Sequence, residues 1–356
     1  MTNLLLLVNE LRYTCGVTNH ILHLSRGLSS SGEVKVWIIT GGGNGVNRFT
    51  GMDVNIITDE RFLHSNRSFS GHVSAISFLV KFVRENNIDI VHSHYHYGAA
   101  IARRASKLCK IPAIQTNHGL LPEMGRLKHF NADKYVAINE HIQEHLLSKK
   151  IAAEKDIYFI RCGIPVEKEL PHKSDSQIRV IAASRFVEGK GVDTFIKAAS
   201  LVNSRGSVNA SFTLAGEGVL EEELKALNNK LNAGVKFVGR ILDMYSLLRE
   251  THILVFPGVS DNEGFPAIIT EAGATGCVLL TSRFNAAGNI LIDGENCRMF
   301  APGDEKELSD ILTGCITNYE KMKPLAANLY EKIKKEYDLQ TMIDKHLLMY
   351  KECLAG

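Results

Sequence analysis

The chain has no apolar run long enough to cross a membrane, and its cysteines form neither a disulfide framework nor a zinc pattern. The opening run Leu4–Val8 is too short for the core of a signal peptide or for a membrane span. The seven cysteines are scattered, odd in number and without a CxxC pair, which is typical of reduced thiols in a cytoplasmic protein. We therefore expect a cytoplasmic protein, which could still lie peripherally on the inner face of a membrane.

The chain also lacks a strong excess of either charge, any low-complexity tract and any internal repeat. Its formal net charge of +2 is too small to indicate nucleic acid as the main partner. The apolar fraction of 45% and the charged fraction of 22% are those of a soluble globular protein. With 356 residues, the chain has room for two domains.

Short apolar runs alternate with longer amphipathic segments along the whole chain, a pattern typical of βα units and parallel sheets. In the first half, the candidate strands are Leu4–Val8, Val34–Thr40, Ile88–His92, Ala113–Thr116 and Tyr135–Ile138. The candidate helices between them are Asn19–Leu28, Val73–Arg84 and Gly98–Cys109.

The segment 165–177 interrupts this alternation with two prolines and many charged or hydroxyl residues, and we predict that it is a linker. After it, the predicted strands are Arg179–Ala183, Ser211–Ala215, Val235–Val238, Ile253–Phe256 and Cys277–Thr281. The predicted helices are Val192–Asn203, Glu221–Leu231, Met244–Glu250 and Pro266–Ala274, with helical pattern to the end beyond Glu305.

The predicted fold class is α/β, with two doubly wound, Rossmann-like domains that face a central cleft. We expect an N-terminal domain at 1–164 and a C-terminal domain at 178–338. A final helix at about 339–356 is expected to pack back on the first domain. Folds of this kind bind ligands at the carboxyl ends of their strands.

The segment SDNEGFPAIITEAGA, residues 260–274, leaves the end of a predicted strand. Pro266 suits the first turn of a helix, where its missing N–H costs nothing. Free N–H groups around Gly264 and Phe265, together with the partial positive charge of the helix start, favour a diphosphate.

Two carboxylates, Glu263 and Glu271, lie at a spacing that can flank one ligand, and they can accept hydrogen bonds from sugar or ribose hydroxyls. The alternative is a capped surface helix with two solvated acids.

The segment SRFVEGKGVD also follows a predicted strand directly. It carries Arg185 and, between two glycines, Lys190. Two cations on a glycine-containing loop suit a phosphate clamp, but a solvated loop has the same composition. Gly216, in the GxG of AGEGVL, is weak evidence, because glycines punctuate most βα turns.

In the first half, Gly16 follows the first strand, where it could admit a ligand close to the backbone or simply form a tight turn. His92, His94 and His96 alternate, and a three-histidine zinc site is conceivable. We expect instead that this run leaves the strand, and no clear fourth ligand for zinc is near it in the sequence. His118 follows another strand, as a sugar contact or as a loop residue.

Several segments together resemble the retaining GT-B glycosyltransferases of family 4 over nearly the whole chain. They are, in the second half, SRFVEGKGVDTFIKA, FTLAGEGVLEEELKAL, VKFVGRI and VFPGVSDNEGFPAIITEAGATGCVLLTS, and in the first half DIVHSHYHYGAAIARR, IPAIQTNHG, ADKYVAINE and YFIRCGIP. The most specific part is the E-x7-E element from Glu263 to Glu271.

The resemblance implies a role for each candidate residue. Arg185 and Lys190 would hold the pyrophosphate, and Glu271 the ribose hydroxyls. The residues facing the donor sugar would be Glu263, Gly264, Phe265 and Pro266, with His118 beside the transferred sugar. Gly16 would lie near acceptor and phosphate, and Gly216 at the donor. The stretch Val238–Ile241, which contains Gly239 and Arg240, would border the nucleotide base.

The implied reaction moves a sugar from a nucleoside diphosphate sugar of UDP or GDP type to an acceptor hydroxyl, with retention of anomeric configuration. The acceptor would be a glycan, glycolipid or lipid-linked sugar in cell-surface synthesis. No DxD motif precedes the donor loop, so no metal or other cofactor is expected.

Three departures from the family pattern, Cys15, Pro165 and Ser184, put the acceptor side in more doubt than the donor side. The alternatives are a GT-B epimerase, a phosphorylase (for which no pyridoxal-lysine motif is visible) and a non-catalytic binding subunit. A dinucleotide-dependent dehydrogenase is disfavoured, because no GxGxxG follows the first strand.

Overall fold

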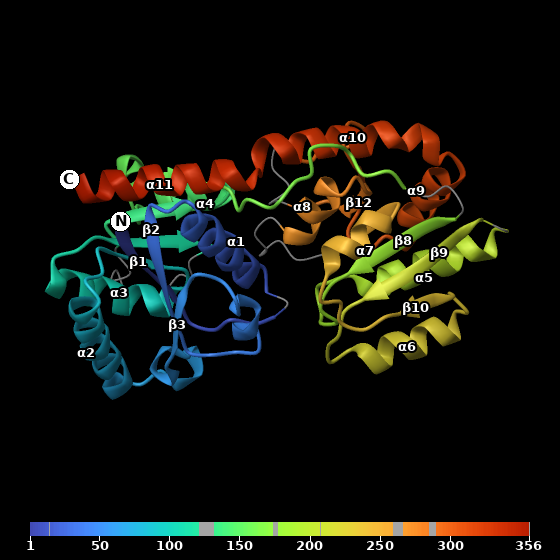
Figure 1. Cartoon of the computed structure of the whole chain (residues 1–356). Helices are drawn as coiled ribbons and strands as arrows, with labels where there is room; N and C mark the ends of the chain where they lie inside the picture. The colour runs from blue at the N-terminus through green and yellow to red at the C-terminus, as the bar shows by residue number, and fades with distance from the viewer. Residues whose placement is uncertain are drawn as a thin grey trace. The chain divides into compact units, whose positions relative to one another are not determined.

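The computed structural model describes residues 1–13, 15–120, 132–173, 177–206, 208–258, 266–284 and 290–355. The chain divides into two compact units, which are treated separately here (Figure 1). Unit 1 comprises Met1–Ile164 and Tyr337–Gly356, and unit 2 comprises Pro165–Glu336.

Unit 1 is built on a parallel seven-stranded sheet with the order β3-β2-β1-β4-β5-β6-β7. Its strands are β1 (Thr2–Val8), β2 (Val34–Thr40), β3 (Asn55–Thr58), β4 (Ile90–Ser93), β5 (Ala113–Asn117), β6 (Lys134–Ala137) and β7 (Ile157–Phe159). Side chains alternate between the two faces of a strand. In β1, Leu4 and Leu6 enter one apolar core while Leu5 and Leu7 enter the other, so β1 is covered on both sides.

Helices cover both faces of this sheet. They are α1 (Gly16–Ser30), α2 (Phe69–Glu85), α3 (His96–Cys109), α4 (Glu140–Ser148) and α11 (Leu339–Ala355), with short 3-10 helices at Val46–Phe49, Glu60–Phe62, His64–Asn66 and Glu154–Asp156. Helices α2 and α3 share the core of Leu5 and Leu7, and α11 packs beside α1 in the other core. The hydroxyl of Tyr350 in α11 lies 2.8 Å from Nδ1 of His92 in β4, so α11 contacts a central strand of this sheet.

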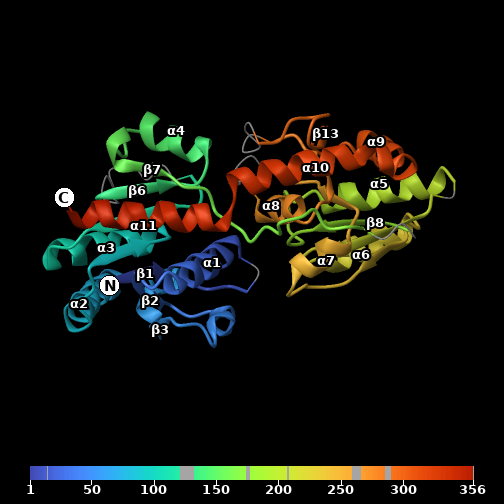
Figure 2. The same ribbon diagram turned by 45° about the horizontal axis from the view of Figure 1, so that its top comes forward.

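Unit 2 is built on a parallel six-stranded sheet with the order β10-β9-β8-β11-β12-β13. Its strands are β8 (Ile178–Ala183), β9 (Ala210–Ala215), β10 (Val235–Phe237), β11 (Ile253–Phe256), β12 (Val278–Ser282) and β13 (Arg298–Phe300). Its helices are α5 (Val192–Ser204), α6 (Glu221–Lys230), α7 (Met244–Glu250), α8 (Ala267–Ala274), α9 (Glu305–Thr317) and α10 (Tyr319–Glu336). Helix α10 lies against α8 (Figure 2) and against β12.

Each sheet has one position at which the strand order reverses. In unit 1 it lies between β1 and β4, and in unit 2 between β8 and β11. In doubly wound sheets, ligands bind outside the carboxyl ends of the strands at this switch point. The predicted fold class of two doubly wound domains is confirmed for each unit taken by itself.

Some predicted elements differ in detail from the structure. Helix α8 begins at Ala267, and Pro266 is its N-cap in extended conformation rather than its first helical residue. Strands β3, β7 and β13 and helix α4 were not predicted. Among the described residues, no helix is both long and apolar enough to span a membrane.

Candidate functional site

The loop after β8 in unit 2 holds the two predicted phosphate-binding cations. Phe186 is only 1% exposed and anchors this loop. Its N–H donates to the Glu217 carbonyl at 2.9 Å, and its own carbonyl accepts from the Leu220 N–H at 3.1 Å. Because Phe186 points into the core, the preceding Arg185 is left exposed at the edge of the sheet.

Lys190 lies at the far end of the same loop and is half-buried. Burial, and then the charge of Arg185, lower the pKa of Lys190 to about 8. The next residue, Gly191, has a φ of +62°, and a Cβ there would lie 1.9 Å from the carbonyl oxygen of Pro257. Only glycine fits this approach, which places Lys190 beside the end of β11. The two cations therefore flank the switch point of unit 2.

The loops after β9 and β10 lie at the same edge of the sheet of unit 2. The Gly216 N–H donates to the Gly239 carbonyl at 2.8 Å, and both glycines have positive φ, +142° and +67°. A Cβ on Gly216 would lie 1.9 Å from the Ser184 carbonyl oxygen. Arg240 forms an ion pair with Glu217 at 3.4 Å. The predicted phosphate loop and the predicted base-bordering stretch are therefore packed against a common turn.

Helix α8 carries the remaining donor-site candidates. Glu271 lies in its second turn and is partly buried. Pro266 precedes the helix, and α8 packs against α7 and α10. Glu263, Gly264 and Phe265 lie outside the described residues, so their predicted roles stay predictions.

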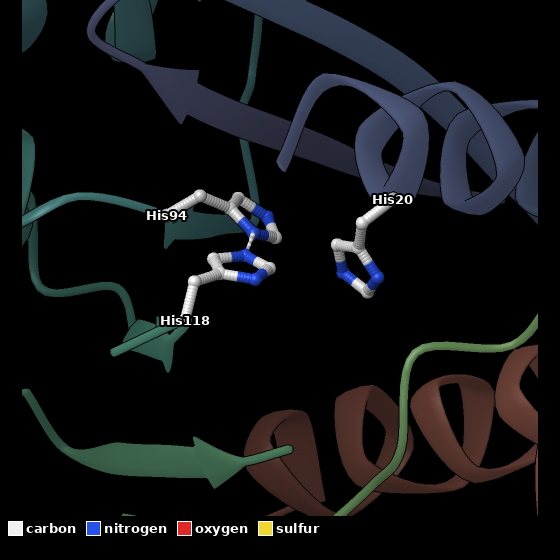
Figure 3. Close-up of side chains that lie close together, drawn as sticks. All are labelled: His20, His94 and His118. Carbon is white, nitrogen blue, oxygen red and sulfur yellow. Dashed lines mark hydrogen bonds between the residues drawn. The ribbon is translucent and has the colours of Figure 1, made fainter. Parts of the chain in front are cut away.

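The switch point of unit 1 carries histidines instead of cations (Figure 3). His94 follows β4, His118 follows β5 and His20 lies on α1, so three separate elements bring them together. Nδ1 of His94 lies 3.2 Å from Nε2 of His118. His20 and His94 are 3% and 1% exposed, and His118 is partly exposed.

The surroundings of these rings favour their neutral form. Burial, together with the charge that nearby histidines would carry, lowers the pKa of His20 and His94 well below the usual value and that of His118 to about 3. His92 lies beneath them, 2.7 Å from Thr116 Oγ1 through Nε2. A neutral imidazole can donate one hydrogen bond, accept one, or bind a metal ion.

Gly16 lies at this same edge. It begins α1 with an exposed backbone, after Cys15 in extended conformation. Cys15 Sγ is 3.7 Å from the hydroxyl of Tyr95, which follows β4. Of the alternating histidines, the strand β4 contains only His92, as the expectation that the run leaves the strand requires.

Sequence reasoning did not find His20. It lies within a predicted amphipathic helix, where a buried histidine carries no local signal of function. His94 was considered only with its neighbours in sequence, but its partners are His20 and His118. The order β1-β4-β5 in the sheet is what brings these three residues together.

Comparison with known proteins agrees with this architecture. Residues 14–168 match the model described as glycosyltransferase family 4, and residues 177–318 match the model described as glycosyl transferases group 1. An uncharacterized glycosyltransferase of Methanocaldococcus jannaschii is 26% identical over 342 residues, which cover 91% of each chain.

Two further matches give the chemistry of similar proteins. An Escherichia coli UDP-Gal:alpha-D-GlcNAc-diphosphoundecaprenol alpha-1,3-galactosyltransferase is 22% identical, over 79% of each chain. The structure of HepE from Anabaena in complex with UDP aligns with a TM-score of 0.81 at 17% identity, over 99% of this chain and 100% of that one.

Two doubly wound parallel sheets with such structural neighbours define the GT-B fold class. The chain belongs to the group 1 glycosyltransferases of family 4, whose two models together match most of its length.

Proposed function

We propose that this enzyme transfers a sugar from a nucleoside diphosphate sugar, with uridine as the first candidate base, to an acceptor hydroxyl with retention of anomeric configuration. The observation that carries the proposal is the pair Arg185 and Lys190 at the switch point between β8 and β11. The UDP bound to HepE and the UDP-galactose used by the E. coli relative support uridine.

The two cations suit the diphosphate of such a donor. Burial, and then the charge of Arg185, lower the pKa of Lys190, and the second cause means that the two positive groups repel each other. An anion between them relieves this repulsion and favours the charged form of Lys190. Negative charge grows on the diphosphate as the glycosidic bond breaks, so preorganised cations stabilise the transition state more than the ground state.

The remaining roles are assigned through the family resemblance. Glu271 binds the ribose hydroxyls, Glu263 and the amides after it orient the sugar, and His118 contacts the transferred sugar. The leaving phosphate accepts the proton of the acceptor hydroxyl, so the reaction needs neither a dedicated protein base nor a catalytic metal ion.

The acceptor is proposed to be a lipid-linked sugar or glycan, as in the E. coli relative that acts on a diphosphoundecaprenol-linked sugar. Helix α3 offers a basic surface for peripheral contact with an anionic membrane. Arg103 pairs with Asp133, which leaves Arg104 and Lys107, beside the 60% exposed Leu108, as the candidate lipid contacts.

Thermal unfolding against a panel of nucleotide sugars tests the proposal. A donor present at 100 times its dissociation constant stabilises the folded protein by about 2.7 kcal/mol. We expect UDP-sugars to raise the melting temperature more than GDP-sugars do, with a chelator present throughout. If no nucleotide sugar changes the melting temperature, the proposal is wrong.

Product analysis with the stabilising donor then separates the remaining activities. A transferase releases the nucleoside diphosphate and forms a glycosylated acceptor, with the anomeric configuration readable by NMR. An epimerase converts the donor sugar without an acceptor, and a binding subunit gives a thermal shift with no product.

A further inference from the structure

Three histidines at the switch point of unit 1 have the arrangement of a metal-binding group (Figure 3). Each of His20, His94 and His118 can offer a ring nitrogen such that the three nitrogens lie within 4.8 Å of one another. The histidines come from α1, from the end of β4 and from the end of β5, which are elements of the packed sheet and its covering helix. Their backbone positions are therefore held by the fold.

The spacing of the three rings matches a shared tetrahedral ion. With Zn–N bonds of 2.0–2.1 Å, two imidazoles on one tetrahedral zinc have nitrogens about 3.3 Å apart and ring centres about 5.2 Å apart. The ring centres here are 4.9 Å apart for His20 and His118, and 5.5 Å apart for the other two pairs. Nδ1 of His94 and Nε2 of His118 are 3.2 Å apart and share a hydrogen bond, so one of these two rings must change its tautomer for both nitrogens to bind an ion.

The same rings contain buried nitrogens without a protein partner. Among the residues that the structure describes, neither ring nitrogen of His20 has a hydrogen-bond partner, and Nε2 of His94 has none. Both side chains are more than nine-tenths buried. A buried polar atom without a partner costs about 1–3 kcal/mol. A bound cation would give these atoms a partner, and neutral nitrogen lone pairs suit a soft or borderline cation.

We propose that unit 1 binds one divalent transition-metal ion of the zinc class through His20, His94 and His118, with the fourth coordination position open. The metal-binding form of imidazole is the neutral one. Burial disfavours the charged form of each ring.

The proposed metal site has a consequence for sugar transfer, and this consequence rests on the proposed contact between His118 and the donor sugar. A ring nitrogen that ligates a metal ion cannot donate to a hydroxyl. The ion should therefore inhibit transfer reversibly, whereas the transfer reaction itself needs no metal. Inhibition by the ion and metal-independent transfer are compatible, because the ion would bind to unit 1 whereas the transfer step depends on the diphosphate.

Cobalt titration of the full chain, stripped with a chelator, tests the site without any transferase assay. Tetrahedral Co²⁺ bound to nitrogen absorbs strongly in the visible range, unlike hydrated Co²⁺. We expect a saturable band at one equivalent of Co²⁺ that Zn²⁺ abolishes. The variant His20→Gln should bind Co²⁺ at least tenfold more weakly. The matched control is His23→Gln, one turn further along α1 and outside the group, which should titrate like the wild type.

A cobalt spectrum of the wild type that shows no tetrahedral band, or the same affinity in His20→Gln, overturns the proposal. If His20→Gln does not fold, the zinc X-ray absorption spectrum of the wild type decides the question. Scattering from three imidazoles supports the site, and an oxygen-only shell overturns it. Neither measurement depends on finding the donor or the acceptor.

Inhibition of the transferase reaction by zinc is a separate test. Zinc should inhibit the wild type, a chelator should restore the rate, and His20→Gln should need at least tenfold more zinc for the same inhibition. Zinc that binds with the predicted spectrum but leaves turnover unchanged would remove the sugar-contact role of His118 and leave the metal site standing.

Discussion

At the carboxyl edge of its sheet, unit 2 presents Arg185 and Lys190, whereas unit 1 presents His20, His94 and His118 at the matching edge. Both edges lie where the strand order reverses, and in both the side chains come from the loops and helices that follow the central strands. The two units share this arrangement of strands, but their candidate side chains differ in charge.

The difference shows how one topology serves two kinds of chemistry. The cations of unit 2 lie on a loop that glycines hold against neighbouring turns, where a diphosphate could reach them. Burial disfavours the charged form of the histidines of unit 1, so they suit hydroxyl groups or a metal ion. Variants that affect only one edge can separate the two roles.

The largest expected effect is on turnover when a cation of unit 2 is removed. Lys190→Ala and Arg185→Ala should each lower kcat by about 100-fold or more, and raise the KM for the donor much less. Steady-state kinetics with varied donor concentration measure both values.

The matched control for this charge removal is Lys197→Ala, in the α5 helix that follows the loop. Lys197 pairs with Asp193 on the helix surface, at 2.7 Å. Its loss should leave kcat within about twofold, as for an exposed ion pair of small energy. A Lys190→Ala enzyme with normal kcat and only a raised KM would limit Lys190 to ground-state binding.

The next effect concerns donor affinity. Glu271→Ala should weaken donor binding by about 1.5–3 kcal/mol, the usual loss for a hydrogen bond to a charged group. Calorimetry of the nucleoside diphosphate measures this loss, with the exposed Glu222→Ala of α6 as control. Unchanged affinity in a folded Glu271→Ala protein would remove this residue from the site.

A backbone substitution tests whether the loop geometry, and not charge alone, defines the unit 2 edge. Gly191→Ala places a Cβ against the Pro257 carbonyl at a φ of +62°, so we expect a loss of stability of about 1–3 kcal/mol or more. Gly303→Ala is the control, since its φ is +77° but nothing lies within 4 Å of the new Cβ. Chemical denaturation should show the larger loss for Gly191→Ala, and equal losses would contradict the close approach.

The last effect is a pH dependence of the stability of unit 1. Burial lowers the pKa of His23 and of His346 to about 4. Unfolded histidine binds a proton near pH 6.5. Between pH 6.5 and 4, the unfolded chain therefore binds more protons than the folded one, and stability falls as the pH falls.

The only tryptophan, Trp37, lies in β2, so its fluorescence reports the unfolding of unit 1. With a chelator present, its melting midpoint should drop by several degrees from pH 7 to pH 5, and by less in His23→Gln. A midpoint that is independent of pH in this range would mean that the buried rings are already protonated or accessible to water.

Strong local patterns made most of the fold predictable. The strand β11 has the predicted bounds, because its four residues form a continuous buried apolar run. The strands β3 and β7 were missed, since both are short and only partly buried and lie at the edges of the sheet. Edge strands need no apolar run, so their sequences carry little signal.

The two candidate sites also differ in how far they can be predicted from the sequence. Arg185 and Lys190 follow one readable strand, so a single loop predicted both. The contact between Gly216 and Gly239 depends on the pairing of β9 with β10, and the group of His20, His94 and His118 depends on the order of three strands. Tertiary pairing of this kind is not encoded in any one segment.

The central claim is that Arg185 and Lys190 act on one diphosphate, and a double-mutant cycle of kcat tests it most directly. If each single variant loses about 100-fold, independent action predicts a loss of about 10,000-fold for Arg185→Ala with Lys190→Ala. The account predicts a smaller loss, nearer to 1,000-fold, because the second cation has less to stabilise once the first is gone. A loss of kcat in the double variant equal to the product of the two single losses would contradict a shared diphosphate.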